Sequence, residues 1–270
     1  MNAYPLLYGR TKFVDYLSDF LVKPNGVDYH KCGKYISGMT KDLDSNKVRY
    51  CVFDDGEYLI CGISCFVDEL YKRTGKADLT SYAKDKFGRG IMLFIGYAFP
   101  KTGFATGNDI PDIGFDDLAD IFLKYIPEQW NYPSGVSGRV TSDQYNVVTK
   151  IFDSVNLSSD LLNGINLVSG IDEKKAFEIF LRKNLSGDNS SFISNVSTKQ
   201  QFEKLAFEYA IVEENVINSV KLANDAAQPP AAISPAKPVS KINPLVPIAI
   251  SAAVAVGGIL SVVLFRFLNQ

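Results

Sequence analysis

The segment that most constrains this chain is an uncharged apolar run near its end. Residues 248–265 contain no charged side chain and consist of small and hydrophobic residues with two serines among them. At ~1.5 Å per residue, a helix of this length spans roughly 27 Å, which is close to the hydrocarbon thickness of a bilayer. We therefore expect a single C-terminal transmembrane helix, a lipid bilayer as a partner, and a tail-anchored, single-pass membrane protein.

One face of this expected helix carries small residues at every fourth position. The stripe consists of Ala249, Ala253, Gly257 and Ser261. Small side chains let two helices approach closely in lipid, where van der Waals packing drives their association. The stripe predicts membrane self-association and hence a homo-oligomer. A generic alanine-rich anchor is the alternative interpretation.

The stretch before the anchor is rich in proline. Residues 226–247 hold six of the twelve prolines in the chain, which predicts a semi-rigid Pro/Ala-rich linker. The first residues lack a basic segment followed by a long apolar run, so we expect no signal peptide. These features predict a membrane location with residues 1–225 in the cytoplasm.

The charge of the region before the linker is acidic. It contains all 30 acidic residues and 25 of the 28 lysines and arginines, because only Lys237, Lys241 and Arg266 lie beyond it. The resulting formal charge of −5 argues against nucleic acid as the main partner. In a reducing compartment the four cysteines are expected to be thiols.

The first half of the chain predicts a mixture of strands and helices. Asp55-Gly56 between two apolar runs indicates a two-residue hairpin. Both faces of its strands are apolar, which is typical of central strands covered on both sides. Residues 90–99 predict a buried strand, and the segments 115–126 and 11–21 predict helices. The expected cross-strand partners are Phe53 and Tyr58, Val52 and Leu59, and Cys51 and Ile60, which places Cys51 and Cys61 on opposite faces.

The second half predicts helices. Possible capping boxes at 141–144 and 197–200 precede apolar stripes at 147–155 and 202–220, and Asp172 opens a further helix. The segment 192–196 is ambiguous. The predicted fold class is therefore α+β, with a 1–135 α/β-type domain containing a mixed sheet, a 139–225 helical subdomain, the 226–247 linker and the 248–265 transmembrane helix.

Carboxylates form the candidate catalytic group. Asp109, Asp112 and Asp116 lie close in sequence, with Asp117 and Asp120 following. Such a cluster is suited to a hard cation or to general acid catalysis. A polar loop with favourable charges at a helix start is the alternative. His30 is the only histidine and lies two residues before Cys32. A catalytic Cys-His pair usually needs a third residue that orients the imidazole, and the sequence indicates none.

The candidate ligand-binding residues are basic. Arg73, Lys84, Lys86 and Arg89 belong to a segment in which positive charges outnumber negative ones. They fit a phosphate-bearing ligand, an anionic lipid surface or an acidic partner. A solvated face beside the acidic segment is the alternative.

These features favour a binding protein over an enzyme. We expect the cytosolic domain to bind a ligand or a protein, while the anchor localises it, permits self-association and gives it a membrane-effector role. No cofactor and no metal site are predicted. The alternatives are a membrane-tethered, metal-dependent enzyme that uses the carboxylates at 109–120, and a structural membrane tether.

Overall fold

The computed structural model describes residues 1–227, with gaps at 17–18, 103–107, 132–139 and 154. Residues Met1–Gln228 form one compact unit. None of the helices in the described ranges is both long enough and apolar enough to cross a bilayer. The predicted transmembrane helix and nearly all of the predicted linker lie outside these residues, so both stay predictions.

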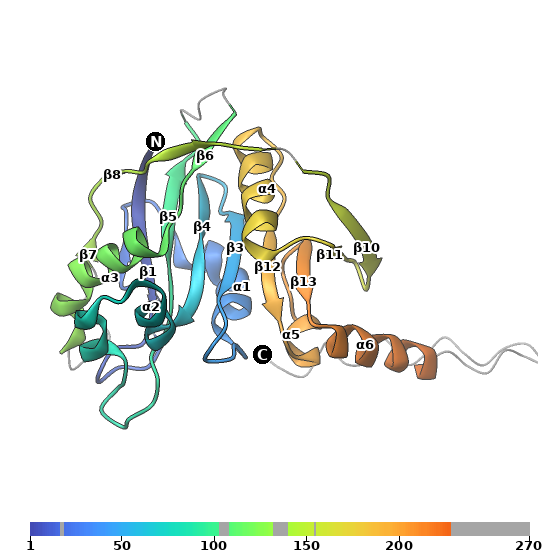
Figure 1. The fold of residues 1–270 in the computed structure, drawn as a ribbon, viewed down its shortest axis with the longest axis horizontal. Helices are drawn as coiled ribbons and strands as arrows, with labels where there is room; N and C mark the ends of the chain where they lie inside the picture. Colours follow the sequence, from blue (N-terminus) through green and yellow to red (C-terminus); the bar gives the residue numbers. More distant parts are fainter. Residues whose placement is uncertain (17–18, 103–107, 132–139, 154, 228–270) are drawn as a thin grey trace, which may run out of the picture. The chain divides into compact units, whose positions relative to one another are not determined.

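A large mixed sheet forms the centre of this unit (Figure 1). In the described part of the chain it has 11 strands, in the order β10-β11-β13-β12-β3-β4-β5-β1-β2-β7, with β8 pairing to β1. The strands are β1 (Asn2–Gly9), β2 (Val22–Lys23), β3 (Arg49–Asp54), β4 (Tyr58–Phe66), β5 (Met92–Pro100), β7 (Val140–Thr141), β8 (Tyr145–Asn146), β10 (Ser158–Leu162), β11 (Ile165–Ser169), β12 (Phe192–Val196) and β13 (Tyr209–Val212). Two short strands, β6 (Asp109–Pro111) and β9 (Thr149–Ile151), pair separately.

The sheet joins an antiparallel part to a parallel part. Strands β1, β3, β4 and β5 pair antiparallel with their neighbours, whereas β11 and β12 each pair parallel with β13. The antiparallel pair of β3 and β12 connects the two parts. The fold is therefore mixed α+β, as predicted.

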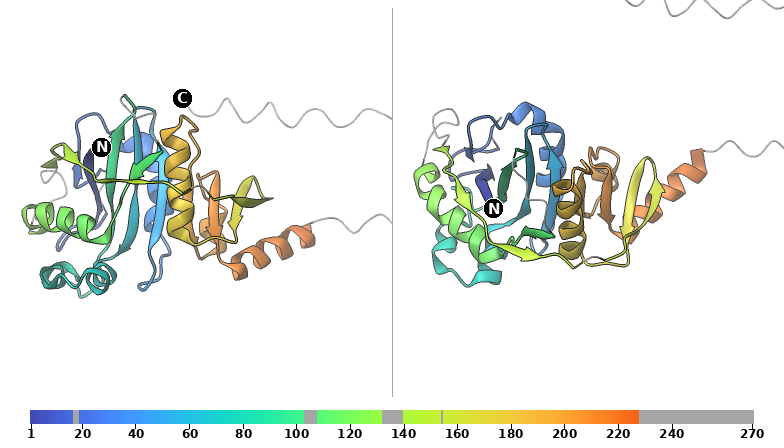
Figure 2. Two further views of the ribbon diagram at one scale, coloured as in Figure 1. Left: turned by 45° about the horizontal axis from the view of Figure 1, so that its top comes forward. Right: turned by 90° about the horizontal axis from the view of Figure 1, so that it is seen from above.

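Helices cover both faces of the sheet, as the right-hand view of Figure 2 shows. One face packs against α2 (Val67–Thr74), α3 (Phe115–Trp130) and α4 (Glu173–Leu185), which share a core with Val52 and Cys61. The other packs against α1 (Tyr29–Thr40), α5 (Lys199–Phe202) and α6 (Glu214–Ala227), which share a core with Cys51 and Phe53. A short 3₁₀ helix, η1, spans Ala77–Tyr82. Burial on both faces explains why the central strands are apolar throughout.

The β3–β4 hairpin has the predicted faces but a different register. Asp54 pairs with Leu59 and Phe53 with Ile60, so the loop is wider than the predicted two residues. Asp55 Oδ1 accepts hydrogen bonds from the backbone amides of Glu57 (2.9 Å) and Tyr58 (2.7 Å), which stabilises this wider loop. The pairing moves by two residues, and a two-residue shift keeps every side chain on its predicted face.

Two helix predictions are confirmed, and one in the first half is wrong. Helix α3 includes the predicted 115–126 segment, and Asp172 caps α4 by accepting a hydrogen bond from the Lys175 amide (2.9 Å). The described residues of 11–21 form bends and irregular backbone instead of a helix. There the Asp15 and Asp19 side chains accept hydrogen bonds from the following backbone amides, and such local bonds compete with a helix. The helix of this region is α1, which begins after Asp28.

The expectation that residues 139–225 are helical is also wrong. The apolar stripe at 147–155 falls partly on the short strand β9 and the stripe at 202–220 is divided among α5, β13 and α6. Thr198, rather than Ser197, caps α5 by accepting from the Gln201 amide (3.1 Å). Strands β10 to β13 therefore extend the central sheet.

A buried arginine holds the junction between the two parts of the sheet. The side chain of Arg49, at the start of β3, is 0% exposed. Its guanidinium donates to backbone carbonyls at the end of α1 and in β12, and to the Gln201 side chain. The closest contacts are to Lys41 O (2.7 Å), Asn195 O (2.8 Å) and Gly38 O (2.9 Å). One side chain thus connects α1, β3, β12 and α5.

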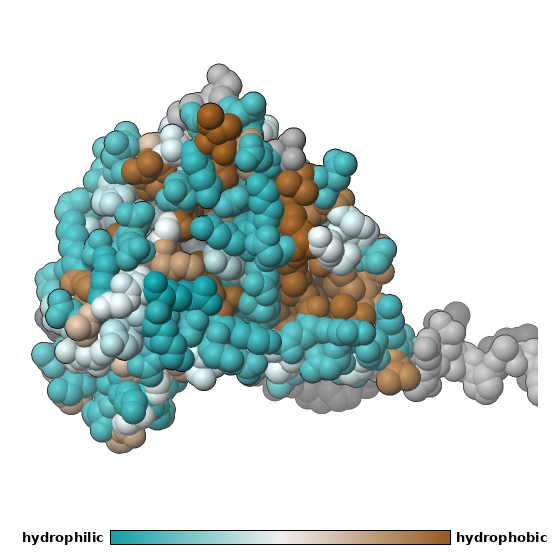
Figure 3. Space-filling view, in the orientation of Figure 1, coloured by the Kyte–Doolittle hydropathy of each residue, from teal (hydrophilic) through white to brown (hydrophobic). Residues whose placement is uncertain are grey.

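The outer part of the parallel region is less covered. Apolar side chains gather beside α4, over β10 and β11, on the face seen in Figure 3. Leu161 of the terminal strand β10 is 71% exposed. The core is therefore concentrated around β3, β4 and β5.

Candidate functional site

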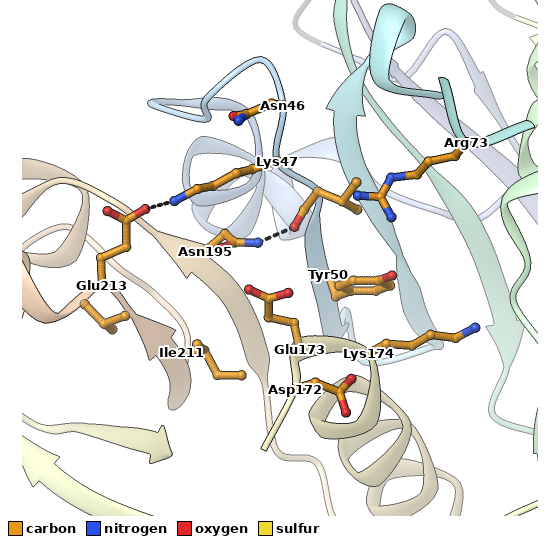
Figure 4. Close-up of a pocket in the computed structure, with 12 residues that line it drawn as sticks. Asn46, Lys47, Tyr50, Arg73, Asp172, Glu173, Lys174, Asn195, Ile211 and Glu213 are labelled. Atoms are coloured by element: carbon orange, nitrogen blue, oxygen red, sulfur yellow. Dashed lines mark hydrogen bonds and ion pairs between the residues drawn. The ribbon is translucent and has the colours of Figure 1, made fainter. Parts of the chain in front are cut away.

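A polar cleft of about 470 Å³ lies beside the junction of the two parts of the sheet (Figure 4). Its lining comes from the segment before β3, from β3 itself, from α2, from the start of α4 and from the ends of β12 and β13. The lining residues are Asn46, Lys47, Val48, Tyr50, Arg73, Asp172, Glu173, Lys174, Asn195, Ile211, Val212 and Glu213.

The topology explains why a cleft forms here. Strands β11 and β13 are parallel neighbours. The chain leaves β11 into α4 on one face of the sheet and leaves β13 into α6 on the other. Connections that diverge to opposite faces leave a crevice at the carboxyl ends of the strands, which is where α/β proteins commonly bind ligands.

Tyr50 contributes a hydroxyl group to the cleft. Its ring packs on Phe177 of α4, with 5.3 Å between centroids, and the residue is only 7% exposed. Burial raises the pKa of Tyr50 to about 12, Arg73 opposes this rise, and Glu173 adds to it. The hydroxyl therefore stays protonated at neutral pH. No hydrogen-bond partner for it is found within the described ranges, so it is free to donate to a ligand.

Asn195 enters the cleft from a distorted strand. The β12–β13 pairing shifts between Ile193 and Val196, and Asn195 has a φ of 54°. Asparagine tolerates this left-handed conformation better than most residues, and such irregularities redirect side chains. Its amide nitrogen donates to Val48 O, and its own carbonyl accepts from Arg49. The Arg49 network therefore fixes one wall of the cleft.

Both signs of charge line the cleft. Lys47 forms an ion pair with Glu213 and lies 3.7 Å from Asp44. Arg73 donates to Glu69 through Nε (2.9 Å) and lies over the Phe115 ring (4.7 Å). This leaves the terminal guanidinium nitrogens of Arg73 without a hydrogen bond to any described residue.

Two charged side chains at the start of α4 also line the cleft. Neither Glu173 nor Lys174 forms an ion pair within the part of the chain that the structure describes. Figure 4 shows Glu173 beside Tyr50, with the Arg73 guanidinium above the ring. A ligand in the cleft would therefore meet donors from Arg73 and Tyr50 and an acceptor from Glu173.

The described lining lacks four residue types that commonly form catalytic pairs. It contains no histidine, cysteine, serine or threonine. The only histidine, His30, lies in the first turn of α1. The lining therefore offers none of the Ser-His or Cys-His pairs that activate a nucleophile.

The predicted basic residues are divided between the cleft and a loop outside it. Arg73 lines the cleft, whereas Lys84 lines another hollow of about 500 Å³ together with Phe66 and Tyr71. Lys86 and Arg89 lie against the exposed ring of Phe87. The structure therefore separates Arg73 from Lys84, Lys86 and Arg89, which belong to the loop between η1 and β5.

Two of the three predicted carboxylates are paired with different lysines. Asp112 lies 3.0 Å from Lys150, which also contacts Glu178, and Asp116 lies 4.0 Å from Lys76. Asp109 is exposed in β6. Within the described ranges, no three His, Cys, Asp or Glu side chains are placed to hold a metal ion. The carboxylate-based enzyme stays a prediction.

The four cysteines are buried and unpaired. Cys51 and Cys61 lie on opposite faces of the sheet, as predicted. Burial raises the pKa of all four thiols, to about 12 for Cys32 and Cys65. The cysteines therefore pack as small apolar side chains.

The small-residue stripe predicted for membrane self-association lies outside the described residues. Its members are Ala249, Ala253, Gly257 and Ser261.

The sequence did not indicate Tyr50, Glu173 or Asn195 as site residues. Recognising them requires the parallel arrangement of β11, β13 and β12, which was hidden by the helical interpretation of the second half. The Asp172 capping signal was the one available clue, because it places a helix start at the cleft. No protein-family model and no curated protein matches this chain, so the site is interpreted from its own geometry.

Proposed function

We propose that this chain is a membrane-anchored binding protein whose folded unit takes a small polar ligand in the cleft. The observation that carries the proposal is the Tyr50 hydroxyl, which is held in a cleft at the carboxyl ends of parallel strands with no partner among the described residues. The span at 248–265 would hold this unit at a bilayer. If self-association of the span opened or disrupted the bilayer, the chain would also be a membrane effector.

The charges in the cleft suggest the chemical class of the ligand. Arg73 and Tyr50 would donate to an anionic group, since charge-assisted bonds from arginine suit carboxylates and phosphates. Glu173 would accept from an ammonium or hydroxyl group. A ligand that carries both kinds of group satisfies this arrangement, whereas an apolar ligand would leave the charges unpaired.

Native mass spectrometry tests the proposal. Residues 1–228, purified from the natural source, should retain a small molecule that is released on denaturation. Rebinding of that molecule can then be titrated by calorimetry. Tyr50→Phe should weaken binding by about fivefold, because one hydrogen bond is worth about 1 kcal/mol.

A matched control separates the cleft from general effects. Tyr71→Phe removes a hydroxyl from an exposed tyrosine outside the cleft and should leave the affinity unchanged. Arg73→Gln and Glu173→Gln should each weaken binding further than Tyr50→Phe, because they remove charged partners. Unaltered affinity in all three cleft variants would refute this location for the ligand.

A further inference from the structure

Two turns at one end of the molecule are joined through the backbone. The first is closed by a hydrogen bond from the Thr11 amide to Val14 O (3.0 Å), and the second by one from Gly88 to Asp85 O (3.0 Å). The Lys86 amide donates to Lys12 O (3.1 Å), which holds the two turns together. The second turn belongs to the loop between η1 and β5, which projects from the lower part of the molecule in Figure 1.

These turns carry exposed aromatic rings with cations on them. Phe87 is 71% exposed and Phe13 is 41% exposed. Lys86 Nζ lies 4.8 Å from the centroid of the Phe87 ring and 5.6 Å from that of Phe13. Lys12 lies 5.4 Å from the Phe13 centroid, and the Arg89 guanidinium 5.4 Å from that of Phe87. The basic aromatic tip is defined here as Lys12, Phe13, Lys84, Lys86, Phe87 and Arg89.

The shape of the tip is fixed by a buried carboxylate. Asp85 accepts hydrogen bonds from the Phe87 amide (2.8 Å), the Arg89 amide (2.9 Å) and Arg89 Nε (2.7 Å). Burial alone would raise the pKa of Asp85, but these bonds hold it below its usual value. The positive charge of Arg89 is neutralised by its ion pairs with Asp85 and Asp15. Lys12, Lys84 and Lys86 have no ion pair with any carboxylate in the described part, so the surface has excess positive charge.

We propose that the basic aromatic tip is a docking surface for an anionic lipid bilayer. Aromatic rings can enter the boundary between headgroups and acyl chains while flanking lysines reach the lipid phosphates. Anionic headgroups attract such cations over about a Debye length. The apolar rings favour this partner over an acidic protein surface, and the predicted anchor brings a bilayer within reach.

Vesicle sedimentation of residues 1–228 tests the tip without the predicted span. This unit has its own two-sided core, and circular dichroism confirms its folding in each variant. We expect binding to phosphatidylcholine vesicles that contain about 30% phosphatidylserine, and at least tenfold weaker binding to phosphatidylcholine alone. Binding to the anionic vesicles should fall as salt rises from about 0.1 M to 0.5 M.

Variants identify the surface. Phe87→Ala should weaken vesicle binding by about tenfold, and each of Lys12→Gln, Lys84→Gln and Lys86→Gln by about fivefold. Leu222→Ala and Lys124→Gln are the matched controls, because they remove an exposed apolar group and a lysine lying over an aromatic ring elsewhere. Both controls should bind as the unaltered protein does.

Three results would overturn the proposal. The first is equal sedimentation with neutral and anionic vesicles. The second is an unchanged vesicle affinity in the tip variants. The third is salt-sensitive binding of a poly-glutamate peptide by a protein that binds no vesicles. The last result would assign the tip to an acidic protein instead. Because the tip variants lie outside the cleft, ligand binding in the cleft can fail or succeed independently of this test.

Discussion

Replacement of Arg49 by methionine should destabilise the folded unit by about 4 kcal/mol. Methionine fills part of the same volume but cannot donate hydrogen bonds. The carbonyls of Met39, Ser194 and Asn195 would then lose their guanidinium partner in a region where Arg49 itself is 0% exposed. Each buried acceptor without a partner costs about 1–3 kcal/mol.

Two opposing effects limit the size of this change. Removing the guanidinium also removes the cost of burying a charge, and the carbonyls of Gly38 and Lys41 keep the Gln201 amide as a second donor. Breaking a buried charged network usually costs about 3–5 kcal/mol. The expected loss is a large fraction of the roughly 5–15 kcal/mol that stabilises a typical domain.

The change in stability is measured by urea unfolding of residues 1–228, with circular dichroism as the signal. Arg49→Lys should recover about half of the lost stability, because an ammonium group has three donors and no planar fork. Arg182→Met is the control, since the Arg182 side chain makes one long hydrogen bond among the described residues, to Asn108 (3.5 Å). Its effect should stay within about 0.5 kcal/mol. A loss below about 1 kcal/mol for Arg49→Met would refute the role assigned to this network.

Three further perturbations test the core, the thiols and the anchor. Gly62→Ala should cost about 2 kcal/mol or more in urea unfolding, because its Cβ would overlap the backbone of β5. Gly33→Ala, where the added Cβ meets open space, should leave the stability unchanged or raise it by up to about 1 kcal/mol. Equal losses of stability in the Gly62 and Gly33 variants would contradict the β4–β5 register. The four buried thiols should react slowly with a disulfide reagent at pH 8 in the native protein, because their raised pKa values keep the reactive thiolate scarce, and all four should react rapidly after denaturation. A single fast native thiol would refute their burial. In a transmembrane association reporter, Gly257→Ile should weaken self-association by about 1 kcal/mol or more, whereas Val256→Ile should not. Equal signals from the unaltered span and from Gly257→Ile would show that the small-residue stripe does not mediate association.

The central hairpin shows what the sequence could predict. The apolar character of both strand faces survives any register shift of two residues, so the covered position of β3 and β4 was predictable. The loop length was not, because it depends on the two hydrogen bonds that Asp55 accepts. Likewise, the spacing of apolar residues was sufficient to predict α3.

The parallel part could not be recognised for a different reason. Buried parallel strands show no alternation of polar and apolar residues, and Tyr209–Val212 is a short apolar run that fits a helix equally well. Helix α1 was missed because Gly33 and Gly38 lower its helix propensity. The cleft depends on both the parallel strands and the backbone of Asn195, so only the helix start at Asp172 was accessible from the sequence.

The order of strands has a consequence for how the molecule is made. Strand β13 is the last strand of the described chain, yet it lies between β11 and β12, which precede it. Until β13 is inserted, the facing edges of both neighbours are open to pairing with other chains. The β11–β13 pairs, such as Leu167 with Ala210, also join residues distant in sequence, and such pairings form slowly. We therefore expect chains shortened before residue 209 to aggregate, and the cleft to arise only at the final step of folding, so that a ligand would recognise completed chains alone.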